Sequence, residues 1–284
     1  MLKVTFSDFW PDFDYHNNFF INLIKEVKGE DNVQVVPFDQ ADVLIYSCFG
    51  NNHHSFDGCK IYYTGENIRL NFDECNYSMT FDFEDYSGRN VRVPLWMLQI
   101  DWYNKKPGGN PKYALSIDNI NRNEFIETTK NKFCVTVFNN NSPYRFETVH
   151  KLNNYKQVTA YGKPFNNWFY GEDTKYRVLS EHKFNICYEN TIYPGYYTEK
   201  LFHAKTAGCI PIYWCDSHSK EDFNSNCFIN LSDYNNDVDE MIEHVKEIDS
   251  DNELYNKYTR ERLFNKDITL DSLAYIGNFL NRIL

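Results

Sequence analysis

The chain has 284 residues, which is long enough for two domains of about 100 to 150 residues each. Its 40 acidic residues outnumber its 29 lysines and arginines, and the resulting formal net charge of −11 argues against a nucleic-acid or anionic-membrane partner. No apolar run approaches the roughly 20 residues needed to span a bilayer, so we expect a soluble, cytoplasmic chain unless a membrane anchor lies beyond these residues.

The first half of the chain alternates short apolar strands with helical segments, which predicts a doubly wound α/β domain. An amphipathic helix is expected over residues 16–27, and further elements over residues 72–83 and 91–102. The segment 7–14 after the first strand contains no glycine, so a dinucleotide fingerprint is absent and a dehydrogenase is disfavoured. The expected strands are residues 2–6, 33–36, 42–47 and 60–64.

Glu66 follows the expected strand 60–64 almost directly. Gly65 permits a tight turn at the end of that strand, which leaves Glu66 at the sheet edge where α/β folds place functional side chains. On the residues alone, a solvated and inert turn glutamate is the simpler interpretation. Trp96 and Trp102 are candidates for stacking on the ring of a ligand, although core packing explains them more simply.

The eight cysteines show no C-x-x-C spacing and lie mostly in apolar, strand-like runs. We therefore expect buried free thiols rather than disulfides or a zinc motif. His53, His54, Asp57 and Cys59 form the densest group of metal-ligand residues. Their loop does not guarantee a convergent geometry, so no metal site is assigned to it.

The second half of the chain repeats the strand and helix alternation after a loop-rich stretch at residues 105–121, and we place the domain boundary near residue 127. The predicted strands are residues 133–138, 157–160, 183–188, 210–214 and 227–230. Two helices are predicted to begin at residues 143 and 198. Four further helices are predicted over residues 173–181, 237–248, 252–263 and 270–284.

Two of these helices carry a cation in the first turn, namely Arg145 and Lys200. That end of the macrodipole disfavours positive charge, so a bound phosphate is one explanation for both side chains. Glu199 beside Lys200 is able to accept hydrogen bonds from ribose hydroxyls, and Thr198 is the predicted N-cap. The alternative to a phosphate site is that Arg145 is an exposed surface cation and that Glu199 and Lys200 form an ordinary surface pair. Helix physics alone favours this alternative.

Residues 183–216 resemble the signature of the α-1,3/4-fucosyltransferase family, with Tyr188, Tyr197 and Cys215 in place of its usual Phe, Val and Gly. Residues 63–67 resemble a second motif of the family, the turn with Gly-Glu-Asn. The matching positions of the signature are Tyr188, Glu189, Asn190, Tyr196, Tyr197, Thr198, Glu199, Lys200, Leu201, Ala207, Gly208, Pro211, Tyr213 and Trp214.

The resemblance implies an α/β fold of the GT-B type, in which two Rossmann-like domains face each other across a cleft. It implies an acceptor-binding domain at residues 1–127, a GDP-fucose-binding domain at 128–265, and a terminal helix at 266–284 that returns to the first domain. It makes Glu66 the catalytic base. The residues that it assigns to the donor are Arg145, Asn190, Tyr196, Glu199 and Lys200.

The resemblance implies inverting transfer of L-fucose from GDP-fucose to an N-acetyllactosamine-type glycan. The hydroxyl that it implies as acceptor is O-3. Two cations near the diphosphate indicate that no metal is required for leaving-group stabilisation, while stimulation by a divalent metal stays open. A same-fold transferase with another donor or acceptor, and an inactive carbohydrate-binding protein, are the alternatives. The choice between O-3 and O-4 and the oligomeric state are not indicated.

Overall fold

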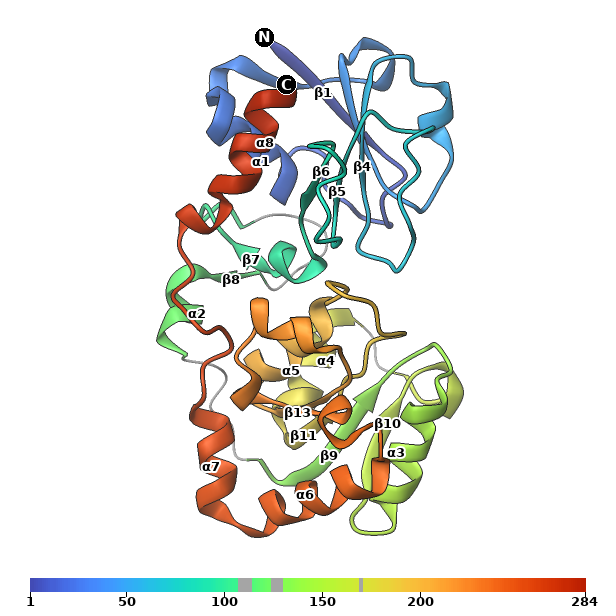
Figure 1. Cartoon of the computed structure of the whole chain (residues 1–284), viewed down its shortest axis with the longest axis vertical. Helices are drawn as coiled ribbons and strands as arrows, with labels where there is room; N and C mark the ends of the chain where they lie inside the picture. Colours follow the sequence, from blue (N-terminus) through green and yellow to red (C-terminus); the bar gives the residue numbers. More distant parts are fainter. Residues whose placement is uncertain (107–113, 124–129, 169–170) are drawn as a thin grey trace. The chain divides into compact units, whose positions relative to one another are not determined.

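The computed structural model describes residues 1–106, 114–123, 130–168 and 171–284, without the side chains of residues 171–174. The chain divides into two compact units, one formed by residues 1–117 with 268–284 and the other by residues 118–267 (Figure 1). The predicted boundary at residue 127 lies outside the described residues. No helix among the described residues is long and apolar enough to cross a membrane.

The first unit contains a parallel sheet with the strand order β2-β1-β3-β4-β5-β6 in the part of the chain described. Its central strands are buried because their side chains are apolar on both faces, as in Leu44, Ile45 and Ile61, which are all 0% exposed. Its strands are β1 (Leu2–Ser7), β2 (Val33–Val35), β3 (Val43–Tyr46), β4 (Cys59–Tyr63), β5 (Tyr77–Thr80) and β6 (Asn90–Arg92).

Helices α1 (Phe19–Lys28) and α8 (Ala274–Ile283) lie side by side on this unit (Figure 1). The side chain of Asn18 caps α1 by accepting a hydrogen bond from the backbone N–H of Ile21. The end of the chain is held here as well, since the hydroxyl of Tyr275 donates to the carbonyl oxygen of Arg92 at 2.8 Å. A short pair, β7 (Ile100–Asp101) with β8 (Leu115–Ser116), completes the unit's described strands.

The second unit contains another parallel sheet, with the strand order β10-β9-β11-β12-β13 in the described residues. The predicted α/β class, with a parallel sheet in each half, is therefore confirmed. The predicted strand 227–230 is shorter than expected, because residues 225–227 form a 3-10 turn before it. The strands are β9 (Lys132–Val137), β10 (Val158–Tyr161), β11 (His182–Ile186), β12 (Ile210–Tyr213) and β13 (Ile229–Asn230).

Two connections of this second sheet matter for function, because the carboxyl ends of β9 and β11 lie side by side. The strand β9 leads into α3, and β11 leads through residues 187–198 into α5. In an open parallel sheet, this edge is where ligands bind. The described helices of the unit are α2 (Ile117–Arg122), α3 (Pro143–Asn153), α4 (Gly171–Ser180), α5 (Glu199–Thr206), α6 (Val238–Ser250) and α7 (Asn252–Arg260).

Candidate functional site

A cavity of about 50 Å³ lies at the carboxyl edge of the second unit's sheet, between the β9 and β11 connections. Three of the predicted donor residues, Arg145, Glu199 and Lys200, line this cavity. The side chain of Asn190 contacts this group, because its Oδ1 accepts a hydrogen bond from Nη2 of Arg145. Tyr196 is 2% exposed and is not among the residues that line the cavity.

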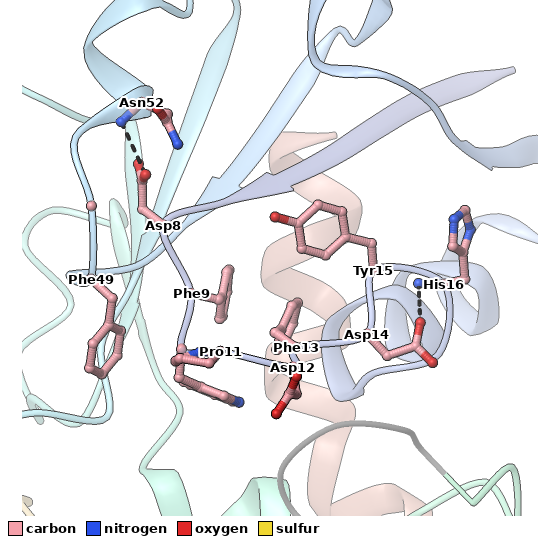
Figure 2. A pocket seen from close by; sticks show the side chains of 12 residues that line it. Asp8, Phe9, Pro11, Asp12, Phe13, Asp14, Tyr15, His16, Phe49 and Asn52 are labelled. Carbon is pink, nitrogen blue, oxygen red and sulfur yellow. Dashed lines mark hydrogen bonds between the residues drawn. The ribbon is translucent and has the colours of Figure 1, made fainter.

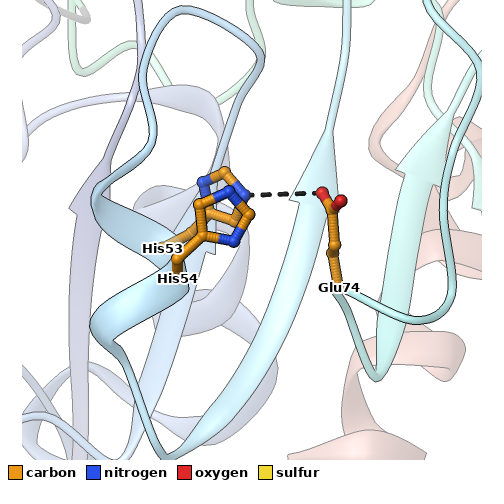
Figure 3. Close-up of side chains that lie close together, drawn as sticks. All are labelled: His53, His54 and Glu74. Carbon is orange, nitrogen blue, oxygen red and sulfur yellow. Dashed lines mark ion pairs between the residues drawn. The ribbon is translucent and has the colours of Figure 1, made fainter.

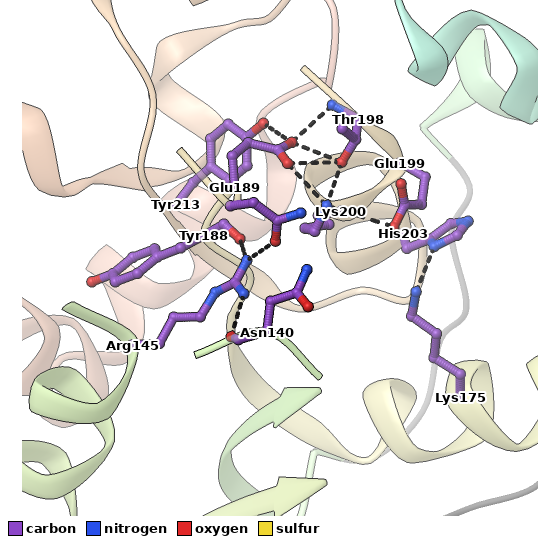
Figure 4. Close-up of polar contacts among 11 residues, drawn as sticks. Asn140, Arg145, Lys175, Tyr188, Glu189, Thr198, Glu199, Lys200, His203 and Tyr213 are labelled. Atoms are coloured by element: carbon purple, nitrogen blue, oxygen red, sulfur yellow. Dashed lines mark hydrogen bonds and ion pairs between the residues drawn. The ribbon is translucent and has the colours of Figure 1, made fainter. Parts of the chain in front are cut away.

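Glu189 is the centre of the polar network at this edge, and its side chain is only 1% exposed (Figure 4). The hydroxyl of Tyr213 donates to its Oε1 at 2.6 Å, and the backbone N–H of Thr198 donates to the same oxygen at 2.8 Å. The ammonium of Lys200 donates to Oε2 at 2.9 Å. A buried carboxylate is tolerated only when it is paired and hydrogen-bonded, and Glu189 meets both conditions.

Lys200 is therefore held in place by protein groups. Its ammonium also donates to Oγ1 of Thr198 at 2.8 Å, and the carboxylate of Glu199 lies 3.9 Å away. Burial by itself lowers the pKa of Lys200, but the charges of Glu189 and Glu199 raise it above its ordinary value. A buried carboxylate thus explains a cation at this helix end, and a phosphate is not needed to account for it.

The predicted cap at Thr198 has a different role. Thr198 occupies the N-cap position of α5 with an extended backbone, but its hydroxyl caps no backbone N–H of the helix. The hydroxyl instead lies between the Glu189 carboxylate and the Lys200 ammonium. Ser142 likewise occupies the N-cap position of α3 without a capping bond from its side chain.

Arg145 is 2% exposed and joins the two connections. Its Nη1 donates to the carbonyl oxygen of Asn140 at 3.1 Å. Its Nη2 donates to the carbonyl oxygen of Tyr188 and, at 3.1 Å, to Oδ1 of Asn190. Burial lowers the pKa of Arg145, although a guanidinium remains charged. These bonds engage three of its five N–H groups among the described residues, and the residue lines the cavity.

Two further residues of this cavity, Lys175 and His203, belong to no sequence motif that predicts a site. The Lys175 ammonium lies 3.0 Å from Nδ1 of His203, which is 3% exposed. Burial and the charge of Lys175 lower the pKa of His203 well below its ordinary value, so His203 is neutral and accepts this bond. Burial raises the pKa of Glu199, but Lys200 and Lys175 outweigh that effect and lower it to about 2.

Asn185, on β11, adds a polar atom to the same cavity. Its side chain is buried, and its Oδ1 has no hydrogen-bond partner among the described residues. Buried polar atoms are normally satisfied, so this oxygen is a candidate to accept a bond from a ligand or from water. The cavity therefore offers cations, one ionised carboxylate and a free amide oxygen.

Glu66 lies in the first unit, in the turn after β4, and its side chain is partly exposed. The hydroxyl of Thr64 fixes the turn, since it accepts from the backbone N–H of Glu66 at 3.0 Å and donates to its carbonyl oxygen at 2.9 Å. Gly65 packs closely here: a Cβ would lie 3.0 Å from Cδ1 of Leu95, so a larger residue would require the Leu95 side chain to shift. The expected turn after β4 is present, and Gly65 also approaches the Leu95 side chain closely.

A second cavity, of about 620 Å³, lies in the first unit along the loop that follows β1 (Figure 2). Its walls are aromatic and acidic, with Phe9 stacked on Phe13 at 3.9 Å between ring centroids and Phe49 49% exposed. The aromatic run at residues 9–15 is the sequence feature that corresponds to this cavity. The tryptophans considered for sugar stacking are instead in the core, since Trp96 is 6% and Trp102 3% exposed.

Comparison with known proteins places these sites in context. The model of the alpha-(1,3)-fucosyltransferase FucT N-terminal domain matches residues 4–99, and that of the glycosyltransferase family 10 (fucosyltransferase) C-terminal region matches residues 127–271. The alpha-(1,3)-fucosyltransferase FucT of Helicobacter pylori is 28% identical over 300 residues, which cover 96% of this chain and 62% of that protein. The putative fucosyltransferase R654 of Acanthamoeba polyphaga mimivirus is 35% identical over 167 residues, covering 54% of this chain and 28% of that protein.

A crystal structure of an alpha1,3-fucosyltransferase with GDP-fucose has the same fold, with a TM-score of 0.72 at 24% identity, and the match covers 98% of this chain and 90% of that one. The match covers less than two thirds of the length of each of the two curated relatives, the FucT of H. pylori and R654 of the mimivirus.

Proposed function

The chain belongs to glycosyltransferase family 10, the fucosyltransferases, as residues 183–216 predicted, and on this premise we propose that it is an inverting α-1,3-fucosyltransferase. It transfers L-fucose from GDP-fucose to the O-3 hydroxyl of an N-acetylglucosamine unit in an N-acetyllactosamine-type glycan. One observation carries the proposal: two adjacent strand-to-helix connections bring Arg145 and Lys200 to one cavity with a carboxylate suited to a ribose. The names of the H. pylori relative and of the GDP-fucose complex support the donor and the linkage.

The donor binds in this proposal at the carboxyl edge of the second unit. The guanidinium of Arg145 and the ammonium of Lys200 contact the diphosphate, and the carboxylate of Glu199 accepts hydrogen bonds from the ribose hydroxyls. Asn190 orients Arg145, which its amide oxygen contacts at 3.1 Å. Tyr196 supports the loop between Glu189 and α5 from the core, where it is buried.

The reaction displaces GDP from the anomeric carbon of fucose. The carboxylate of Glu66 takes the proton of the acceptor hydroxyl, whose oxygen forms the new bond to the anomeric carbon from the face opposite GDP. The bond from that carbon to the diphosphate oxygen breaks, and GDP leaves with the electron pair. Arg145 and Lys200 stabilise the negative charge that develops on GDP, which is the largest contribution these residues make to the rate.

The acceptor sugar binds in this proposal at the aromatic cavity of the first unit. Exposed aromatic faces stack on the apolar faces of sugar rings, and neighbouring carboxylates accept hydrogen bonds from sugar hydroxyls. Phe49 and Tyr15 are 49% and 41% exposed and line this cavity beside Asp12. The cavity and Glu66 both follow carboxyl ends of strands in the same parallel sheet, so they share one edge of it.

The test is acceptor-dependent GDP release from GDP-fucose, with N-acetyllactosamine as acceptor and the linkage read from the product by NMR. Glu66→Gln should lower turnover by more than tenfold, about 1.4 kcal/mol, while the affinity for GDP is kept. The matched control is Glu84→Gln, an exposed glutamate after β5 of the same sheet, which should leave turnover unchanged. Turnover of Glu66→Gln within tenfold of the parent would exclude Glu66 as the base.

Two other outcomes separate the alternatives. Release of a nucleotide from another sugar donor, with GDP-fucose left intact, would keep the fold and change the donor. A melting temperature raised by GDP with no donor consumed would indicate a carbohydrate-binding protein without activity.

A further inference from the structure

Three potential metal ligands converge within the first unit, in the connections that follow β3 and β4. His53 and His54 belong to the 3-10 helix Asn52–Ser55 between β3 and β4, and Glu74 belongs to the connection between β4 and β5 (Figure 3). One ligand atom from each residue lies within 4.8 Å of the other two. The sequence grouped the two histidines with Asp57 and Cys59, whereas the structure places Glu74 beside them.

His53 is oriented by a carboxylate on its far side. Its side chain is 6% exposed, and its Nδ1 lies 2.9 Å from Oδ2 of Asp8, whose own side chain is 0% exposed. The backbone N–H groups of Asn52 and His53 also donate to this carboxylate, each at 3.0 Å, so Asp8 is fixed as an acceptor. Metal-binding histidines typically donate their second ring N–H to a carboxylate in this way.

The other ring nitrogen of His53 has the geometry of a ligand. With Nδ1–H donated to Asp8, Nε2 presents its lone pair, and this buried atom makes no hydrogen bond within the described part of the chain. It faces Oε2 of Glu74 at 3.5 Å. A proton on Nε2 makes this contact an ion pair, and in the neutral ring a metal cation is able to take the position of that proton.

The separation of His53 and Glu74 suits a tetrahedral divalent metal. Zinc bonds of about 2.0–2.1 Å to nitrogen and oxygen place two ligands of a tetrahedron about 3.3–3.4 Å apart, close to the distance between His53 and Glu74. The ring of Tyr46 stacks on His53 at 4.2 Å between centroids and fixes its plane. His54 is exposed, so its ring is able to adjust as the third ligand.

We propose that His53, His54 and Glu74 bind one divalent transition metal ion of the zinc type. Two imidazoles and a carboxylate are a donor set that zinc favours over magnesium or calcium, which take oxygen ligands. The adjoining cavity of about 200 Å³, lined by Cys48, Arg69 and residues of both connections, leaves room for water at a fourth position.

The ion joins the connections that follow β3 and β4. The two histidines lie in residues 47–58, and Glu74 lies in residues 64–76, the connection that also carries Glu66. Binding therefore tethers the loop of Glu66 at its far end and stabilises the first unit, since the metal binds the folded arrangement and not the unfolded chain. The site does not depend on the proposed transferase activity, because its evidence is the geometry of the three ligands.

The test is zinc binding to the full chain, without a polyhistidine tag and freed of metal by a chelator, measured by calorimetry in competition with a chelator of known affinity. The parent should bind one equivalent, and both His54→Ala and Glu74→Gln should weaken binding at least tenfold. The matched control is His218→Ala, which removes a histidine that is 55% exposed and lies 3.0 Å from the Asp216 carboxylate, outside the cluster. It should bind zinc as the parent does.

Two readouts keep the outcome decisive. Thermal unfolding without metal checks that each variant folds, and added zinc should raise the melting temperature of the parent and of His218→Ala more than that of the two ligand variants. Cobalt substituted for zinc should give visible bands of a tetrahedral site without thiolate charge transfer. The proposal is overturned by the absence of stoichiometric binding, by equal affinity in parent and ligand variants, or by a cobalt spectrum dominated by cysteine thiolates.

Discussion

The contact between Glu189 and Lys200 predicts a strong energetic coupling inside the donor cavity. Glu189→Gln keeps the shape of the side chain but removes its charge and replaces one of two acceptor oxygens with an amide donor, although both oxygens now accept bonds, Oε2 from the Lys200 ammonium at 2.9 Å. Removing one partner of a buried ion pair costs about 3–5 kcal/mol. Lys200 is 22% exposed, so water screens part of this loss, and we expect the free energy of unfolding to fall by about 2–3 kcal/mol.

A double-mutant cycle measures the coupling directly. Lys200→Met leaves Glu189 buried without a counterion and should cost a similar amount, whereas the double variant should be more stable than the sum of the two losses by about 2 kcal/mol. The matched control is the pair Glu243 and Lys246 of α6, with a shorter contact of 2.7 Å but side chains 73% and 35% exposed. Its coupling should be about 0.2–0.5 kcal/mol.

The assay is urea unfolding of the four proteins of each cycle, followed by fluorescence and circular dichroism. If the coupling of Glu189 with Lys200 were as small as that of the exposed pair, the carboxylate would not be what holds the lysine at the helix start. The cation would then need another explanation, of which a bound phosphate is the first.

Three further outcomes follow from the same geometry. Arg145→Lys should weaken GDP binding about 10- to 100-fold in calorimetry. A lysine lacks the planar guanidinium with which Arg145 bonds to the carbonyl oxygens of Asn140 and Tyr188 and still reaches a diphosphate. An affinity for GDP within threefold of the parent would contradict the assignment of Arg145 to the donor. Phe49→Ala should raise the KM for the acceptor about three- to tenfold with GDP affinity unchanged, as expected for a lost stacking contact, and an unchanged KM would place the acceptor elsewhere. His203 stays neutral in the folded chain while the unfolded chain protonates it below about pH 6.5, so stability should fall from about pH 7 to about pH 5.5, by about 1.3 kcal/mol from this residue. Urea unfolding should show that His203→Gln removes this part of the pH dependence; an unchanged slope would show that His203 is not the group responsible.

Local patterns predicted most of the fold because the two sheets are parallel and buried. Runs such as residues 43–46 and 210–213 are apolar on both faces, a pattern that follows from helices covering both sides of such a sheet. Arg145 and Lys200 could be singled out because each stands directly after a predicted strand and turn, where the topology itself brings them to one edge. Helix physics alone favoured an ordinary surface role for both, and the resemblance to the family assigned them to one phosphate site.

The remaining parts of the sites depend on contacts between segments distant in sequence. Glu189 stands in the family signature, yet its burial against Tyr213 depends on how two strands lie side by side. Lys175 on α4 and His203 on α5 are 28 residues apart in the sequence, and no local sequence pattern indicates that they lie together. Glu74 was missed for the same reason: residue spacing suggested Asp57 and Cys59 as partners of His53, while the sheet brings a different loop to it.

An acidic chain that binds a nucleotide diphosphate must attract it locally, because its net charge of −11 repels an anion at long range. The proposed donor cavity has only a small excess of positive charge: Arg145, Lys175 and Lys200 face the carboxylates of Glu189 and Glu199, and His203 is neutral. Affinity in this proposal therefore comes from donors fixed in advance, not from the amount of charge. The buried carboxylate of Glu189 holds Lys200 in position before GDP-fucose binds, so little ordering of that side chain remains to oppose binding.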